Sequence, residues 1–313
     1  MGTAFVFPGQ GSQAPGMGQE IFEAFPVARH LLEEIDDALK QKLSKLIAEG
    51  PAEELMLTEN AQPALMAVSM AIVRVLETEA GIDIAKACTF VAGHSLGEYT
   101  ALVAARALNP VDGAKLLKTR GQAMQVAVPV GAGAMAALIG ADLEIAREIA
   151  EAAADGEVCQ AANDNAPGQV VLSGATDAID RAMEIAGERG IKRAILLPVS
   201  APFHCDMMRP AAEVMEEALA ETALVRPVVP VVANVTARAV ENPDAIRKLL
   251  VQQVTAMVRW RECVEVMRDE GTDTIVEIGA GKVLSGLVRR IDRDLKSISV
   301  STPGDIEDLV KSL

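Results

Sequence analysis

The chain alternates between short, almost wholly apolar runs and longer segments in which apolar residues recur every three or four positions. Thr3–Phe7, Cys88–Ala92 and Thr274–Ile278 are runs of the first kind, and we expect Thr274–Ile278 to be the last core strand. Such runs are typical of strands buried on both faces of a parallel sheet, whereas the longer segments are typical of amphipathic helices. The pattern therefore predicts an α/β fold in which helices cover a parallel sheet.

Proline and glycine mark where the predicted elements end. Helical patterns extend from Gly18 to Leu46. The stretch Pro51–Thr58 and the step Gln62–Pro63 are expected to interrupt the chain before an apolar helix from Ala64 to Leu76.

The predicted order of strands and helices changes after Pro129–Gly133, a stretch that has the character of a hinge. From Ala134 to Leu197 the pattern predicts strand, helix, strand, strand, helix and strand, which is the order of a ferredoxin-like unit. We therefore expect residues 128–198 to form a small ferredoxin-like subdomain. It would be inserted into a large α/β subdomain made of residues 1–127 and 199–313.

Composition and charge disfavour several classes of function. The formal net charge is −15 at pH 7, which argues against non-specific binding to nucleic acid. The four cysteines are far apart and lack Cys-x-x-Cys or Cys/His ligand spacing, so we expect neither a disulfide framework nor a metal site. The first residues lack a basic region, and no apolar stretch has membrane-spanning length, so we expect a cytoplasmic protein without a membrane partner.

The stretch Gly93–Gly97, Gly-His-Ser-Leu-Gly, fits the pattern G-x-S-x-G. It follows the expected strand and precedes helix-forming residues from Glu98 to Leu108. Strand, sharp turn and helix form the context in which such a serine, here Ser95, becomes a nucleophile. The helix N-terminus would also stabilise negative charge near its hydroxyl. The alternative is a simple glycine–serine turn without chemistry.

A serine nucleophile needs a base, and the chain has three histidines. His94 adjoins Ser95, and neighbouring side chains on a sharp turn usually diverge. His30 lies in a charged helical segment and is expected to be solvated. His204 lies in a proline-braced loop after a predicted strand, so Ser95 and His204 are the expected dyad, with a structural His204 as the alternative. No acid between them is suitably placed, so we consider a backbone carbonyl or amide as the group that orients His204.

Six blocks of the sequence, taken in order, carry a resemblance to a known family. They are Phe5–Gln13, Gly93–Tyr99, Arg120–Gln125, Asn163–Val170, Ala201–His204 and Glu277–Leu284. They resemble the corresponding blocks of the malonyl-CoA:acyl-carrier-protein transacylases, acyltransferases of bacterial fatty acid synthesis. The resemblance covers nearly the whole chain and implies a hydrolase-like parallel-sheet domain with an inserted ferredoxin-like subdomain.

The resemblance also implies roles for individual residues. Ser95 would take the malonyl group from malonyl-CoA, and His204 would act as its general base. The backbone N–H groups of Gln10 and Leu96 would form the oxyanion hole, where losing one donor typically costs on the order of 10²–10³ in rate.

Two further residues are implied to bind or organise the substrate. Arg120 would hold the malonyl carboxylate through paired hydrogen bonds, which a lysine cannot copy. Gln253 would orient His204 through its backbone carbonyl. Asn163 and Asn165 match a loop near the site, with less definite roles.

The implied reaction is a two-step acyl transfer that uses a coenzyme A thioester as substrate and no bound cofactor. The acceptor would be the phosphopantetheine thiol of acyl carrier protein. A serine thioesterase or esterase, with water as acceptor, is the alternative. Docking of an acidic carrier protein needs a local basic patch, and the densest basic stretch could equally be a solvated helix face. That stretch contains Lys282, Arg289, Arg290, Arg293 and Lys296.

Overall fold

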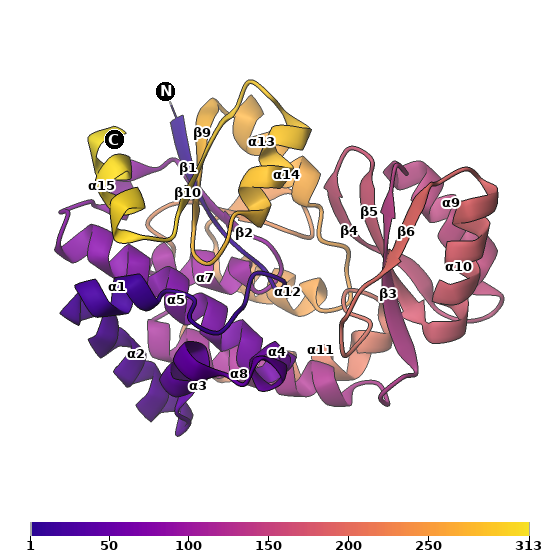
Figure 1. Ribbon diagram of the computed structural model, residues 1–313, viewed down its shortest axis with the longest axis horizontal. Helices are drawn as coiled ribbons and strands as arrows, with labels where there is room; N and C mark the ends of the chain where they lie inside the picture. Colours follow the sequence, from indigo (N-terminus) through magenta and orange to yellow (C-terminus); the bar gives the residue numbers. More distant parts are fainter. Residues whose placement is uncertain (1, 313) are drawn as a thin grey trace.

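Two separate sheets lie side by side in the protein, and each carries its own layers of helices (Figure 1). The computed structural model describes residues 2–312. The strands of the larger sheet are β1 (Gly2–Phe7), β2 (Phe90–Gly93), β7 (Val231–Ala233), β8 (Arg238–Val240), β9 (Thr272–Ile278) and β10 (Lys296–Val300). Their order is β10-β9-β1-β2-β7-β8, and all neighbours are parallel except β7 and β8. The predicted parallel sheet is confirmed.

Helices bury both faces of this sheet. Phe5 and Phe7 of β1 pack on one face, and Ala4 and Val6 pack on the other face near Trp260. The helices of this part are α1 (Gln19–Ala24), α2 (Pro26–Leu39), α3 (Leu43–Glu49), α4 (Ala52–Met56), α5 (Thr58–Thr78), α6 (Ile84–Ala87), α7 (Gly97–Ala104), α8 (Pro110–Val126), α11 (Arg209–Glu221), α12 (Pro243–Gln253), α13 (Trp260–Asp269), α14 (Val283–Ile291) and α15 (Pro303–Ser312). Figure 1 shows α13 and α14 on one side of the sheet and α5, α7 and α8 on the other. Burial on both sides explains why β1 is apolar at every position from Ala4 to Phe7.

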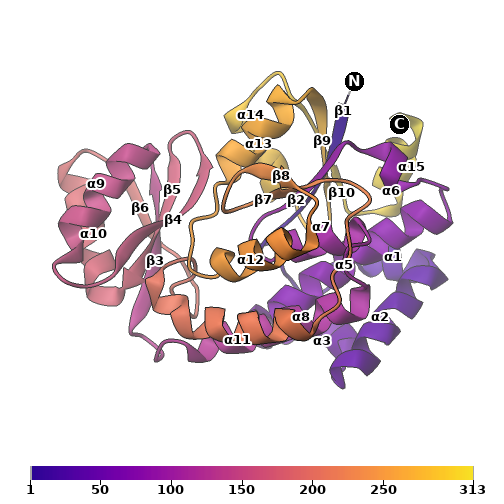
Figure 2. The same cartoon turned by 180° about the vertical axis from the view of Figure 1, so that it is seen from behind.

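The smaller sheet has the ferredoxin-like order that the sequence predicts. Its elements are β3 (Gly133–Ile139), α9 (Leu143–Ala154), β4 (Cys159–Ala166), β5 (Gln169–Ala175), α10 (Thr176–Glu188) and β6 (Arg193–Leu196). The strands are arranged β4-β5-β3-β6, and every neighbouring pair is antiparallel. Both views show α9 and α10 on the face that points away from the larger sheet (Figure 2).

Helix α5 contradicts one expectation. It begins at Thr58 and continues through Pro63, so the predicted interruption at Gln62–Pro63 is wrong. Nearly every residue from Thr58 to Leu76 is buried, and the helix packs along α8. This packing outweighs the local cost of a proline that cannot donate a backbone hydrogen bond.

The end of the larger sheet also differs from the expectation. Thr274–Ile278 belongs to β9, but β10 follows it and pairs with it in parallel, so it is not the last strand. Strand β10 is at the sheet edge, where Lys296 is exposed and Ser297 and Ser299 are half-buried. Polar and apolar residues alternate in β10, and this pattern predicts a strand less strongly than the continuous apolar runs of the central strands.

Candidate active site

The turn between β2 and α7 holds Ser95 in a strained backbone conformation. Ser95 has φ 52°, in the left-handed region that non-glycine residues rarely adopt. A Cβ on Gly93 would lie 1.8 Å from the Gly97 carbonyl carbon, and one on Gly97 would lie 2.3 Å from the Phe7 carbonyl oxygen. Both glycines are therefore required for the turn to close. This geometry matches that of a nucleophile elbow.

His204 lies beside the serine hydroxyl and is oriented from behind by a carbonyl. The Ser95 Oγ to His204 Nε2 distance is 2.7 Å, and His204 Nδ1 donates to the Gln253 carbonyl oxygen at 2.8 Å. A donating Nδ1–H leaves Nε2 free to accept the serine proton. Burial, together with the positive charge of Arg120, lowers the pKa of His204 to about 3, so the imidazole is neutral at pH 7.

The other two histidines take different positions. His94 Nε2 lies 2.8 Å from Asn165 Oδ1, its ring is 5.7 Å from that of Trp260, and it lines the cavity that contains Ser95. His30 is exposed on α2. Asn163 and Asn165 belong to β4 rather than to a loop, which corrects the expectation for them.

Arg120 is a buried cation without a carboxylate partner. Its Nη1 donates to Gln62 Oε1 at 2.7 Å, and its Nη2 donates to Gln253 Oε1 at 2.9 Å and to Ser95 Oγ at 3.2 Å. The guanidinium carbon lies 5.6 Å from the centre of the Tyr99 ring. Although Arg120 is only 1% exposed, no carboxylate within residues 2–312 forms an ion pair with it. A buried guanidinium with only neutral partners favours the binding of an anion beside Ser95.

A cavity of about 340 Å³ lies in front of the serine and between the two sheets. Gln10, Leu96 and Arg120 line it from the larger part, and Met135 and Asn163 line it from the smaller sheet. Within residues 2–312, the backbone N–H groups of Gln10 and Leu96 donate to no other protein group. They are therefore available as donors to a group bound at Ser95.

Sequence reasoning missed a buried hub beneath the elbow, centred on Glu98. Its Oε2 accepts hydrogen bonds from the Asn234 backbone N–H at 3.0 Å and from Gln253 Nε2 at 2.9 Å. Asn234 Oδ1 in turn accepts from the Ser95 N–H at 2.8 Å. Burial raises the pKa of Glu98 to about 7, against the opposing effect of these hydrogen bonds and of Arg120. A single acid in the otherwise uncharged α7 was the only signal in the sequence for this hub.

The amide of Gln253 separates the two buried charges. Its NH₂ group faces Glu98, and its oxygen faces Arg120. In its ionised form, Glu98 therefore compensates the charge of Arg120 through one intervening amide, and it does not contact the guanidinium directly. This arrangement leaves Arg120 open to an external carboxylate.

Two kinds of feature, metal-binding clusters and membrane-spanning helices, are absent from the described residues. Residues 2–312 contain no group of three or more His, Cys, Asp or Glu side chains placed to hold a metal ion. Over the same residues, no helix combines the length and the apolar character that crossing a membrane requires.

Comparison with known proteins places this chain in a family. Residues 4–302 match the acyl transferase domain family. The chain is 47% identical over 311 residues to the malonyl CoA-acyl carrier protein transacylase of Bacillus subtilis, covering 99% of this chain and 96% of that protein. It is 44% identical over 300 residues to the protein of the same name from Escherichia coli, covering 96% of each.

Solved structures agree with the sequence comparisons. The acyl-carrier-protein-S-malonyltransferase from Bartonella henselae superposes with a TM-score of 0.98 at 54% identity, covering 100% of this chain and 99% of that chain. A malonyl-transacylase solved in complex with a type II PKS acyl-carrier protein superposes with a TM-score of 0.97 at 40% identity, covering 100% of both chains. The chain therefore belongs to the malonyl CoA-acyl carrier protein transacylase family of acyl transferases.

Proposed function

We propose that this protein transfers the malonyl group of malonyl-CoA to the phosphopantetheine thiol of acyl carrier protein, for fatty acid biosynthesis. The observation that carries the proposal is the position of Arg120, a buried guanidinium 3.2 Å from Ser95 Oγ with no carboxylate of its own. Malonyl is an acyl group that ends in a carboxylate, and Arg120 offers that carboxylate a partner beside the nucleophile. The names of the relatives support the same reaction.

The first step forms a malonyl-serine ester. Ser95 Oγ attacks the thioester carbonyl carbon while His204 Nε2 takes the hydroxyl proton. The N–H groups of Gln10 and Leu96 stabilise the oxyanion of the tetrahedral intermediate. The carbon–sulfur bond then breaks, and the proton on His204 passes to the departing coenzyme A thiolate.

The second step reverses these roles with a different thiol. His204 takes the proton of the phosphopantetheine thiol, whose sulfur attacks the ester carbonyl. The bond to Ser95 Oγ breaks, and His204 returns the proton to the serine. Both steps use groups of the chain and of the two substrates, so coenzyme A takes part only as a thioester substrate and product, and no bound cofactor is required.

We infer that the acyl group is held between the two subdomains. Ser95, Arg120 and His204 belong to residues 1–127 and 199–313, whereas Met135 and Asn163 belong to residues 128–198. The small subdomain would thus close the cavity over the bound acyl group and limit the access of water.

Mass spectrometry of the intact protein mixed with malonyl-CoA tests the proposal. We expect a malonyl adduct on the wild-type protein and none on Ser95→Ala. Adding phosphopantetheinylated acyl carrier protein should move the malonyl group to the carrier. Accumulation of free malonate with no malonyl-carrier would instead indicate a thioesterase, and absence of any adduct on the wild type would refute acyl transfer through a serine.

A further inference from the structure

The segment from Gln253 to Arg261 joins the catalytic groups to the small sheet. Gln253, at its start, provides the carbonyl that orients His204. Val258, in its middle, is fully buried and forms a parallel bridge with Asn163 of β4. In this bridge the Val258 N–H donates to the Ala162 carbonyl at 2.9 Å, and the Asp164 N–H donates to the Val258 carbonyl at 3.0 Å.

Strand β4 presents two different faces at this point. Asn163 lines the catalytic cavity, and Asn165 contacts His94, the neighbour of Ser95. Asp164, between them, makes contact with helix α13 instead. The pairing of β4 with β5 is irregular on both sides of Asp164, with register shifts between Ala161 and Asn163 and between Asp164 and Ala166. Such irregularities bend and twist a strand and re-aim its side chains, so contacts from outside the small sheet contribute to the placement of these asparagines.

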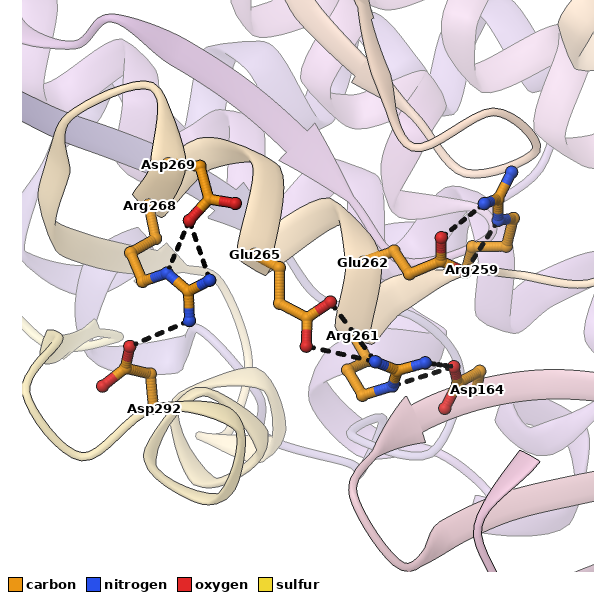
Figure 3. Close-up of polar contacts among 8 residues, drawn as sticks. All are labelled: Asp164, Arg259, Arg261, Glu262, Glu265, Arg268, Asp269 and Asp292. Atoms are coloured by element: carbon orange, nitrogen blue, oxygen red, sulfur yellow. Dashed lines mark hydrogen bonds and ion pairs between the residues drawn. The ribbon is translucent and has the colours of Figure 1, made fainter. Parts of the chain in front are cut away.

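The side chain of Asp164 is bound by one arginine. Arg261 Nε and Nη2 donate to Asp164 Oδ2 at 3.0 and 2.8 Å. The Asp164 side chain is only 2% exposed, and within residues 2–312 Arg261 is its only ion-pair partner. Figure 3 shows that this pair joins β4 to α13 and that Arg261 Nη1 also donates to the carboxylate of Glu265. Loss of the arginine would leave a buried carboxylate without compensation.

We propose that the Asp164–Arg261 ion pair is a positioning device for acyl transfer, because it locks β4 against the segment that carries Gln253. The lock holds Asn163 at the cavity wall and keeps the Gln253 carbonyl behind His204. Asp164 and Arg261 are positioning residues, since neither lines the catalytic cavity. The catalytic part of this inference rests on the proposed function.

The same helix offers a matched control. Arg268 of α13 also pairs with two carboxylates, Asp269 and Asp292, and is similarly half-buried (Figure 3). Neither partner belongs to β4 or to the 253–261 segment. Arg261→Gln and Arg268→Gln therefore remove the same charge from the same helix, and only the first breaks the lock.

The experiment measures the rate of acyl-enzyme formation in a single turnover, with malonyl-CoA and with acetyl-CoA, well below the melting temperature of each full-length variant. We expect Arg261→Gln to slow both reactions roughly ten-fold, since a ~1 Å misplacement can cost on the order of 10²-fold. The preference for malonyl over acetyl should be retained, because Arg120 is untouched. Arg268→Gln should stay within about two-fold of the wild type, because neither Asp269 nor Asp292 belongs to β4 or to the 253–261 segment.

Two further measurements separate positioning from general loss of stability. We expect the Nδ1 proton of His204, which is hydrogen-bonded to the Gln253 carbonyl, to give a low-field NMR resonance. We expect this resonance to shift or broaden in Arg261→Gln and not in Arg268→Gln. Adding Asp164→Asn to Arg261→Gln should recover part of the lost rate, because the uncompensated charge is then removed.

The outcomes distinguish this inference from the proposed function. A wild-type rate and an unchanged His204 resonance in Arg261→Gln would overturn the inference, as would an equal loss in Arg268→Gln. If Arg261→Gln does not fold, Arg261→Lys, which keeps the charge but not the two-nitrogen contact, should show the smaller form of the same changes. If the wild type forms no acyl-enzyme, the proposed function fails, and the NMR comparison still tests the lock.

Discussion

Replacing Glu98 by glutamine removes a buried ionisable group and keeps an oxygen that can accept from Asn234 and Gln253. Burial raises the pKa of Glu98 from 4.5 to about 7. Between these values the folded protein holds a proton on Glu98 that the unfolded chain has released, so this group makes the wild-type protein less stable as the pH rises through that window. At ~1.4 kcal/mol for each pH unit, the full effect is roughly 3 kcal/mol.

Denaturant unfolding of the wild type and of Glu98→Gln at several pH values between about 4 and 8 measures this effect. Relative to the wild type, the variant should gain roughly 3 kcal/mol of unfolding free energy from the acid to the alkaline end of the series. The depressed pKa of His204 gives the opposite slope below pH 6.5, but it does so in both proteins and cancels in the difference. A difference that stays constant over this range would show that Glu98 ionises normally, and the account of the hub would then be wrong.

Three further predictions concern the reaction. Arg120→Lys should lower kcat/KM for malonyl-CoA by on the order of 10²-fold more than for acetyl-CoA, because one ammonium cannot replace the paired donors; equal losses would contradict the carboxylate role. Because burial and Arg120 lower the pKa of His204 to about 3, the acid limb of the single-turnover rate with acetyl-CoA should lie well below pH 6.5, and a limb centred at 6.5 would contradict a neutral, buried base. Reversing Arg289 and Arg290, both exposed on α14, to glutamate should raise the KM for carrier protein and leave that for malonyl-CoA unchanged, and an unchanged carrier KM would remove this patch as the docking surface.

The fold could be predicted because its signals are local. Strand β1 is apolar on both faces, and β3 to β6 alternate with amphipathic helices, so each element shows its own period over a few residues. Pro63 shows the limit of this method, since only the packing of α5 against α8 explains a helix that continues through a proline. A single sequence contains the local preference but not the packing that overrides it.

The site residues also differ in whether the sequence alone predicts them. Ser95 has a local signature of two glycines, a strand and a helix, and His204 follows from there being so few histidines. Glu98 has no comparable signature, because its partners Asn234 and Gln253 lie 136 and 155 residues further along the chain. The Asp164–Arg261 pair joins strand β4 to helix α13 across 97 residues of sequence, and neither residue type marks the role by itself. Long-range polar contacts of this kind become visible only in the folded chain.

His204 is oriented by the backbone carbonyl of Gln253 and not by an acid. The negative charge of the proposed substrate gives a physical reason for this difference. A carboxylate behind His204 would add a negative charge close to Arg120, whose own charge already contributes to lowering the pKa of His204. It would neutralise the guanidinium and repel a second carboxylate arriving with the acyl group. A backbone carbonyl fixes the same imidazole tautomer without adding charge, and Glu98 is held one amide away. The uncharged carbonyl behind His204 therefore helps to keep Arg120 without a carboxylate partner and available to the substrate. We infer that this arrangement is suited to an anionic acyl group.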